Sequence, residues 1–228
     1  MTLISAWITD AAADRDGSSG SPYLEDAAGQ TLSYAGLHRS VLAWARRLDR
    51  AGIPPGGAVA LRWPDPLGYA TALVSILGAG RVVVPLDPAA PPAELARVLA
   101  VARPAAVVAG SGQDLPPGLT VLSPPEVPDG RGHTEGAGGA ESAAGAESAA
   151  GAESAGSGAG GIFLCTSGTT GTPKGILLGE DQLAHVAAAV AGHHRLTPAD
   201  RGYCCLPLFH VNAEVVGLLA TLAARACL

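Results

Sequence analysis

Short β-rich runs alternate with helical stretches through the first half of the chain. Apolar side chains at helical spacing predict an amphipathic helix over 34–51, which Ser33 caps and Gly52 ends; they are Tyr34, Leu37, Val41, Ala45 and Leu48. The pattern continues as strand 58–63, helix 66–77, strand 82–85, helix 93–101 and strand 105–109. Strands that alternate with helices pair in parallel, so the sequence predicts an α/β fold of mostly parallel sheets flanked by helices.

Composition narrows the class of protein. The 228 residues are 48% hydrophobic and 15% charged, which is enough apolar material to bury a sizeable core. The net charge is −6 and the basic residues are scattered, which argues against nucleic acid as a partner. The uncharged apolar runs 67–80 and 215–224 are too short to cross a bilayer, and the N-terminus lacks a basic flank before Asp10. We therefore expect no membrane span and a cytoplasmic location.

The four cysteines have neither a CxxC spacing nor a paired framework; they are Cys165, Cys204, Cys205 and Cys227. If residues 204 and 205 lie in a strand, the two adjacent side chains point to opposite faces. We expect reduced thiols and no metal site.

Residues 123–160 differ in character from their surroundings. The hexapeptide Gly-Ala-Glu-Ser-Ala-Ala occurs at 139–144 and 145–150, and a near copy follows at 151–156. A glycine every six residues and the lack of an apolar stripe leave little to pack, so the segment is interpreted as a flexible surface loop. A helical repeat or a binding module is the alternative.

A loop rich in hydroxyl groups and glycine follows an apolar run at 163–165. Backbone N–H groups, hydroxyls and one ammonium in such a loop suit phosphate oxygens; the candidate phosphate-binding residues are Thr166, Ser167, Gly168, Thr169, Thr170, Gly171 and Lys174. Pro173 and Gly175 flank the lysine, whereas the common nucleotide-binding P-loop needs Gly before it and Ser or Thr after it.

This loop resembles the signature of the adenylate-forming superfamily, which includes acyl-CoA synthetases, aryl-CoA ligases, luciferases and the adenylation domains of peptide synthetases. Segments 32–37, 74–95 and 203–213 resemble other family segments in the expected order. The resemblance implies the N-terminal part of the large domain of these enzymes. On this basis we divide the chain into a first α/β subdomain at 1–122, the low-complexity loop at 123–160, and a phosphate loop with the start of an acyl-pocket subdomain at 161–228.

Three further elements follow from the residues after the loop. A strand is expected over 175–178, and a helix that Asp181 begins is expected to bury one apolar face, formed by Leu183, Val186, Ala187 and Val190. A second helix continues through Val215, Leu218, Leu219 and Leu222. Many relatives carry Ser or Thr and then His where this chain has Gly179-Glu180-Asp181, a departure expected to affect only the surface or a nearby cap.

The resemblance also implies a reaction, in which a carboxylic acid and ATP give an acyl-adenylate and pyrophosphate, with Mg²⁺ screening the phosphates. Coenzyme A or a carrier phosphopantetheine is the expected acceptor. Adenylation domains for amino acids usually carry Phe-Asp where this chain has Phe209-His210, and histidine there is typical of acyl- and aryl-CoA ligases. His210 is thus a candidate substrate-binding residue, and a partly buried or capping histidine without a chemical task is the alternative.

Family members are considerably longer than this chain, and their adenine and ribose ligands and catalytic lysine have no counterpart in it. We therefore expect that this chain contains no catalytic residue and that it is a truncated portion of a ligase, inactive alone. A partner polypeptide could supply the C-terminal part. The alternatives are a non-catalytic nucleotide-binding or partner protein derived from a ligase, and a peptide-synthetase module.

The interpretation of the repeats can be tested by deleting residues 139–156. Halving a flexible loop changes the free energy of closing it by only about 0.6 kcal/mol, so the melting temperature should barely move. Thermal unfolding of the deleted and intact chains measures this, and a large fall would mean that the repeats pack against the body of the protein.

Overall fold

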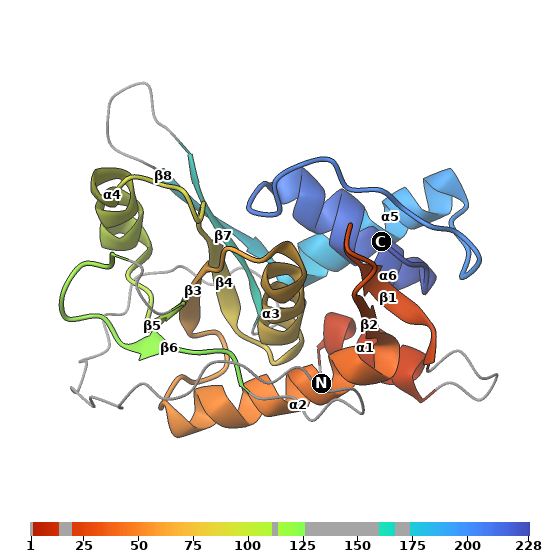
Figure 1. Cartoon of the computed structure of the whole chain (residues 1–228), viewed down its shortest axis with the longest axis horizontal. Coiled ribbons are helices and arrows are strands. Elements are labelled where there is room, and N and C mark those ends of the chain that lie inside the picture. Colours follow the sequence, from red (N-terminus) through yellow and green to blue (C-terminus); the bar gives the residue numbers. More distant parts are fainter. Residues whose placement is uncertain (1, 14–19, 111–113, 126–159, 167–173) are drawn as a thin grey trace.

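A computed structural model describes residues 2–13, 20–110, 114–125, 160–166 and 174–228. Six strands form one sheet in the order β6-β5-β3-β4-β7-β8, and two more form a small separate sheet (Figure 1). The six are β3 (Ala58–Arg62), β4 (Val82–Pro85), β5 (Ala106–Ala109), β6 (Val121–Leu122), β7 (Gly161–Thr166) and β8 (Lys174–Gly179). This architecture confirms the expected α/β class.

Parallel pairing dominates the large sheet. Strand β3 lies between β4 and β5 and is parallel to both, and β6 continues the sheet in parallel beside β5. Strand β7 is parallel to β4, whereas β8 at the edge is antiparallel to β7. The carboxyl ends of the parallel strands therefore meet at one edge of the sheet, which is where ligands bind in open α/β sheets.

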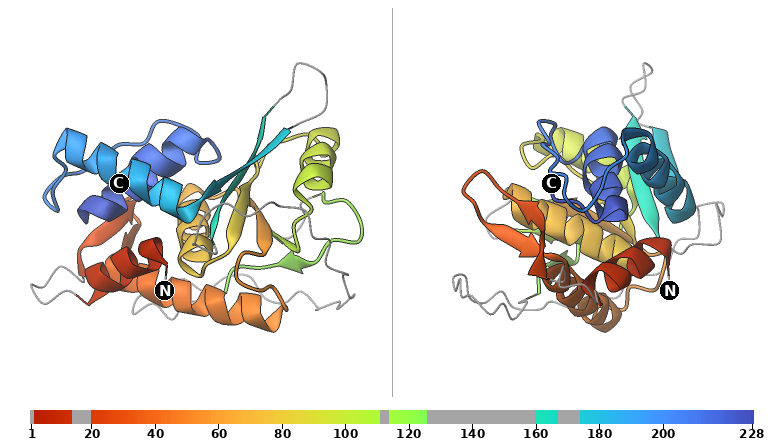
Figure 2. Two further views of the ribbon diagram at one scale, coloured as in Figure 1. Left: turned by 180° about the vertical axis from the view of Figure 1, so that it is seen from behind. Right: turned by 90° about the vertical axis from the view of Figure 1, so that its right-hand side faces the viewer.

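Alternate residues of the strands face two separate cores. Val59, Leu61 and Val83 pack beneath helix α3 (Pro66–Gly78), which α2 (Tyr34–Arg50) and α1 (Leu3–Ala12) cover in turn. The opposite face carries Ala60 and Val84 beneath helix α4 (Pro92–Ala102). Figure 2 shows α2 and α3 stacked on one side of the sheet and α4 on the other. Burial of both faces explains the nearly continuous apolar strands.

Helices α2, α3 and α4 confirm the sequence predictions. Helix α2 begins where expected, because the hydroxyl of Ser33 accepts a hydrogen bond from the N–H of Gly36 at 3.1 Å. Asp65 caps α3 in the same way by accepting from the N–H of Gly68.

The C-terminal part of the chain differs from the predictions in its helices and around the two adjacent cysteines. Helix α5 (Glu180–His194) begins one residue before Asp181, and Val186 is 46% exposed instead of buried, because Leu183 and the small alanines face the core. The next helical segment contains a π-helix, η2 (Ala213–Leu219), before it continues as α6 (Ala220–Ala224). Residues 202–205 form no strand, so the alternation of faces considered for Cys204 and Cys205 does not apply. Cys204 is half-buried and Cys205 is exposed.

Two N-terminal elements were not expected from the sequence. They are helix α1 and the small sheet, in which β1 (Pro22–Glu25) and β2 (Thr31–Ser33) pair in antiparallel fashion. The Tyr23 hydroxyl donates to the carbonyl of Leu218 at 2.8 Å, and the Tyr34 hydroxyl donates to that of Ala226 at 2.7 Å. The N-terminal quarter is thereby bound to η2 and α6. No helix in the described ranges is long and apolar enough to cross a membrane.

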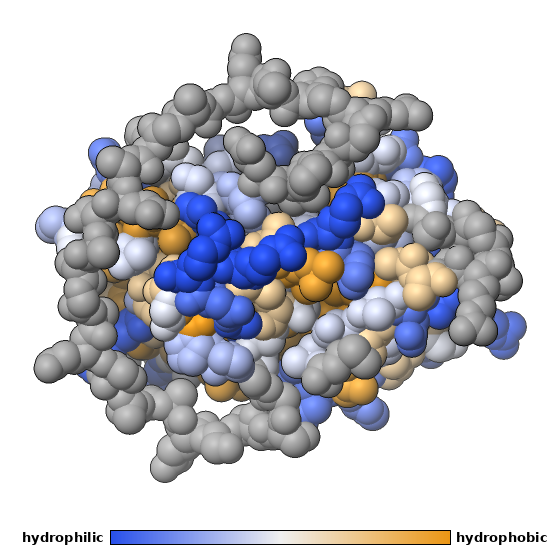
Figure 3. Space-filling view, turned by 90° about the horizontal axis from the view of Figure 1, so that it is seen from below, coloured by the Kyte–Doolittle hydropathy of each residue, from blue (hydrophilic) through white to orange (hydrophobic). Residues whose placement is uncertain are grey.

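Helix α2 forms the outermost layer beneath the sheet. Seen from below, this face carries a band of hydrophilic side chains (Figure 3), and α2 supplies exposed Arg39, Arg46, Asp49 and Arg50. The helix therefore presents one charged face to water while its other face is buried.

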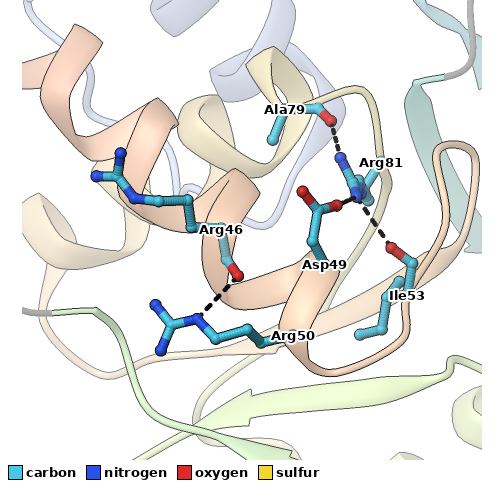
Figure 4. A network of polar contacts seen from close by, with 6 residues as sticks. All are labelled: Arg46, Asp49, Arg50, Ile53, Ala79 and Arg81. Carbon is cyan, nitrogen blue, oxygen red and sulfur yellow. Dashed lines mark hydrogen bonds and ion pairs between the residues drawn. The ribbon is translucent and has the colours of Figure 1, made fainter.

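Arg81 joins this outer layer to the sheet. Its side chain is 5% exposed, and the guanidinium pairs with Asp49 and donates to the carbonyls of Ile53, at 3.0 Å, and Ala79 (Figure 4). These contacts hold the end of α2 and the end of α3 beside the first residue of β4. A buried cation with three acceptors is well satisfied except at Nε.

Replacing Arg81 with Met should lower the free energy of unfolding by about 3 kcal/mol, because two carbonyls lose their donor. Asp49→Asn should cost only about 0.5 kcal/mol, since Asp49 is 65% exposed. Arg50→Met is the matched control, because Arg50 is exposed and its described hydrogen bond, to the carbonyl of Arg46, stays within α2. Urea denaturation compares the three variants, and equal losses in all of them would contradict the role assigned to Arg81.

Candidate functional site

The β7–β8 hairpin carries the candidate phosphate loop. Thr166, the last residue of β7, pairs across the ladder with Lys174, the first residue of β8, and at the other end Gly161 pairs with Gly179. The loop thus leaves the sheet at the carboxyl end of a parallel strand. In Figure 1 this end of the hairpin projects away from α2 and α3.

The structure brings together two of the candidate phosphate-binding residues, Thr166 and Lys174, by direct pairing. Ser167, Gly168, Thr169, Thr170 and Gly171 lie outside the described residues. Lys174 is exposed and is the only lysine in the sequence. An ammonium group beside the loop is the donor that phosphate oxygens require. In β7 itself, burial raises the pKa of the Cys165 thiol, so that side chain stays protonated and is a poor nucleophile.

A buried acid lies on the helix that follows His210. Glu214 is 0% exposed, and neither of its carboxylate oxygens has a hydrogen-bond partner in the described part of the chain. Desolvation raises its pKa to about 8, so at neutral pH the carboxyl group is mostly protonated. Such a group can donate one hydrogen bond and accept others.

Tyr69 approaches Glu214 from the first turns of α3. Burial and then the nearby Glu214 raise the pKa of its hydroxyl, with Asp87 adding to the effect. The N–H of Leu86 lies near the hydroxyl but already donates to the carbonyl of Leu61 at 3.0 Å. The Tyr69 hydroxyl therefore has no satisfactory partner among the described residues.

Local backbone geometry also marks this place. Glu214 lies in the π-helix η2, and single π-turns inside helices occur frequently at functional sites. Tyr69 lies in the helix after β3, and Leu86, which lies near its hydroxyl, follows β4. Tyr69 and the neighbouring Glu214 therefore lie at the carboxyl edge of the sheet. Two unsatisfied polar groups at that edge can hydrogen-bond a ligand.

His210 is exposed on the loop before η2. Its ring lies 4.8 Å from that of Phe209, and its carbonyl accepts from the N–H of Glu214 at 3.2 Å. Its described contacts stay within residues 207–214, so no described contact connects it with Thr166. The site thus has two described parts, the mouth of the hairpin and the segment of His210 with Glu214.

The sequence analysis did not single out Glu214 or Tyr69. Glu214 is the one charged residue of the helical run Ala-Glu-Val-Val-Gly-Leu-Leu, whose other residues are apolar. A lone charge in an apolar run is the sequence signal that could have identified it. Tyr69 has no comparable signal, because a tyrosine in an apolar helix is common in cores.

The sequence profile of AMP-binding enzymes matches residues 11–228. The chain belongs to the AMP-binding enzyme family. This chain is 30% identical over 221 residues to the oxalate–CoA ligase of Arabidopsis thaliana, a match that covers 86% of the chain and 39% of that ligase. It is 32% identical over 221 residues to the isonitrile lipopeptide synthase of Streptomyces coeruleorubidus, with 97% and 14% covered.

A solved structure shares the fold. ATP-bound MatB from Rhodopseudomonas palustris superposes with a TM-score of 0.71 at 26% identity, over 100% of this AMP-binding chain and 44% of MatB. The chain therefore spans less than half the length of these relatives, and its alignment with them supports acid adenylation as the chemistry of the family.

The burial of Glu214 predicts a specific dependence of stability on pH. Its pKa in the folded state, about 8, exceeds that of an unfolded glutamate, so the folded state holds the proton more tightly. Its contribution to stability is greatest below about pH 4.5 and is lost as the pH rises towards 8, by up to about 1.4 kcal/mol per pH unit.

Glu214→Gln should remove this component, so the variant gains stability relative to the natural protein as the pH rises from 5 to 8. Urea denaturation at several pH values measures the difference, and Glu94→Gln on the exposed face of α4 serves as the control. Parallel pH curves for the natural protein and Glu214→Gln would show that Glu214 is not held protonated.

Proposed function

We propose that this chain supplies the phosphate-binding part of an enzyme that activates a carboxylic acid with ATP. The acid's carboxylate oxygen attacks the α-phosphorus, the bond to the bridging oxygen breaks, and pyrophosphate leaves with the electron pair. The observation that carries the proposal is the hairpin geometry, in which the Thr/Ser/Gly loop leaves the carboxyl end of β7 and returns at Lys174. Membership of the AMP-binding family supports it.

We assign the loop the task of stabilising the negative charge that develops in the reaction. Negative charge accumulates on the departing pyrophosphate, and preorganised donors stabilise it best. We assign the β- and γ-phosphates to the loop residues Thr166, Ser167, Gly168, Thr169, Thr170 and Gly171, together with Lys174. Mg²⁺ would bind mainly through the phosphate oxygens, as it does at other nucleotide sites. No residue of the chain is assigned a catalytic role.

The acceptor and the acid are proposed on the basis of His210. A neutral or cationic imidazole offers no negative partner to the ammonium of an amino acid, so we propose an acid without an α-amino group and transfer to coenzyme A or a carrier phosphopantetheine. The lipopeptide synthase relative supports the alternative, a peptide-synthetase module. Carboxylate-dependent pyrophosphate exchange with free amino acids would favour that alternative.

Because the relatives extend well beyond the matched region, we propose that turnover requires a polypeptide that provides the remaining part of their fold. A non-catalytic nucleotide-binding role is the alternative if no such part assembles with this chain. We also propose a cytoplasmic location, where ATP and reduced acceptor thiols occur together.

Loss of one hydrogen bond to a charged group should weaken ATP binding roughly ten- to a hundredfold, about 1.5 to 3 kcal/mol. Lys174→Ala and Thr169→Val test this by calorimetric titration with ATP and Mg²⁺, with Arg50→Ala as a matched loss of one exposed cation on α2. Unchanged affinity in both loop variants would overturn the assignment of the loop.

A further inference from the structure

Glu180 stands at the base of the β7–β8 hairpin, as the first residue of α5. The sequence analysis placed this departure at the surface or a nearby cap, but the side chain is only 1% exposed. A buried carboxylate is expensive unless it is hydrogen-bonded, so its contacts reveal why it is there.

The side chain of Glu180 holds the N-terminus of α1. Its Oε1 accepts a hydrogen bond from the N–H of Ile4 at 2.7 Å, across 176 residues of sequence. Thr2 satisfies a second donor of the same turn by accepting from the N–H of Ser5 at 3.2 Å. A carboxylate at a helix N-terminus is also favoured by the helix dipole. The sequence analysis missed this contact because Ile4 and Glu180 are far apart in the sequence.

The backbone of Glu180 holds the first residues of the hairpin. Its N–H donates to the carbonyl of Gly160 at 3.1 Å, directly before β7. A Cβ at Gly160 would lie 3.3 Å from Oε2 of Glu180 and 3.3 Å from the carbonyl of Arg81, and one at Gly161 would lie 2.5 Å from the carbonyl of Leu178. Two glycines therefore allow α5, β7 and β4 to approach closely at this point.

The far end of the hairpin depends on this base. Five residue steps separate the Gly161–Gly179 pair from the Thr166–Lys174 pair, a span of about 17 Å at about 3.3 Å per residue. Burial in β8 declines along the span, from buried Gly179 to exposed Ile176 and Lys174. The outer half is held by its own ladder and by packing of β7 and β8 against α4, where Phe163 joins the core beneath that helix. The position of its other end is set where the hairpin is anchored at Glu180.

We propose that Glu180 is a positioning residue that fixes the β7–β8 hairpin against α1 and so determines where Lys174 is presented to a polyphosphate. The link to phosphate rests on the function proposed above, whereas the link from Glu180 to the hairpin does not. Helix α1 thereby becomes part of the support of the binding site, although it lies beside α2 and away from the outer ends of β7 and β8 (Figure 2).

The test compares Glu180→Leu with Glu180→Gln in the full 228-residue chain. Leucine fills the buried space without a polar atom, and replacing a buried charge by an apolar residue often leaves stability nearly unchanged. Glutamine can still accept from Ile4. Asp181→Asn is the control, because it removes the same charge one residue further on at an exposed position.

Two measurements separate positioning from folding. Amide hydrogen exchange reports the N–H of Ile4 and those of residues 174–178, and tripolyphosphate titration is followed through the single lysine labelled with ¹⁵N. In Glu180→Leu we expect exchange at both places to accelerate about tenfold and tripolyphosphate affinity to fall about tenfold, the value of one hydrogen bond to a charged group. Glu180→Gln should restore most of both.

The sign of the affinity change is itself diagnostic. Removing a negative charge should strengthen anion binding slightly through the long-range field, as in Asp181→Asn, so a loss in Glu180→Leu points to geometry. Natural affinity and natural exchange at 174–178 in a folded Glu180→Leu variant would overturn the inference. If the natural protein does not bind tripolyphosphate, the phosphate assignment fails, and the exchange rates alone decide the role of Glu180.

Discussion

The pairing of β7 with β4 is the constraint on which the arrangement of the site depends. Val82 and Val83 pair with Gly161 and Ile162, which places β7 in parallel beside the central strands and directs its end to their carboxyl edge. The chain then reverses and pairs β8 in antiparallel fashion. The two strands therefore place Thr166 and Lys174 at the carboxyl end of β7, as Tyr69 follows the carboxyl end of β3.

Three buried charged residues, Arg81, Glu180 and Glu214, differ in whether they have hydrogen-bond partners, and this difference separates structural roles from a binding role. Arg81 pairs with Asp49 and donates to two carbonyls, so it holds elements together. Glu180 does the same through one side-chain contact, the N–H of Ile4 on Oε1, while its Oε2 has no partner among the described residues. Glu214 has no partner in the described residues and keeps a proton instead, with a pKa of about 8. A buried acid with neither oxygen hydrogen-bonded costs stability, which is expected of groups at binding sites more than of structural ones.

How much was predictable depended on whether the signal was local. Helices α2 and α3 were predicted because their sequences form clear helical runs, the first of them capped by Ser33, and the central strands because they are continuous apolar segments. The apolar face of α5 was misread because alanine, not Val186, packs inward. Helix α1 was missed although Thr2, Ile4 and Ile8 gave its cap and stripe. The contact of Glu180 with Ile4 and the burial of Glu214 had no local signal, since both depend on tertiary packing.

Hydrogen bonds between β1 and the residues after α6 also help to hold the helix that carries Glu214. Leu228 donates to the carbonyl of Tyr23 at 2.8 Å and accepts from the N–H of Glu25 at 2.9 Å, so the residues after α6 pair with β1. Tyr23 in turn bonds the carbonyl of Leu218 in η2. The helix that carries Glu214 is thus held by N-terminal residues, as α1 holds the hairpin through Glu180. Both described parts of the site are supported by the first 25 residues, and perturbations there should reach the site without touching it.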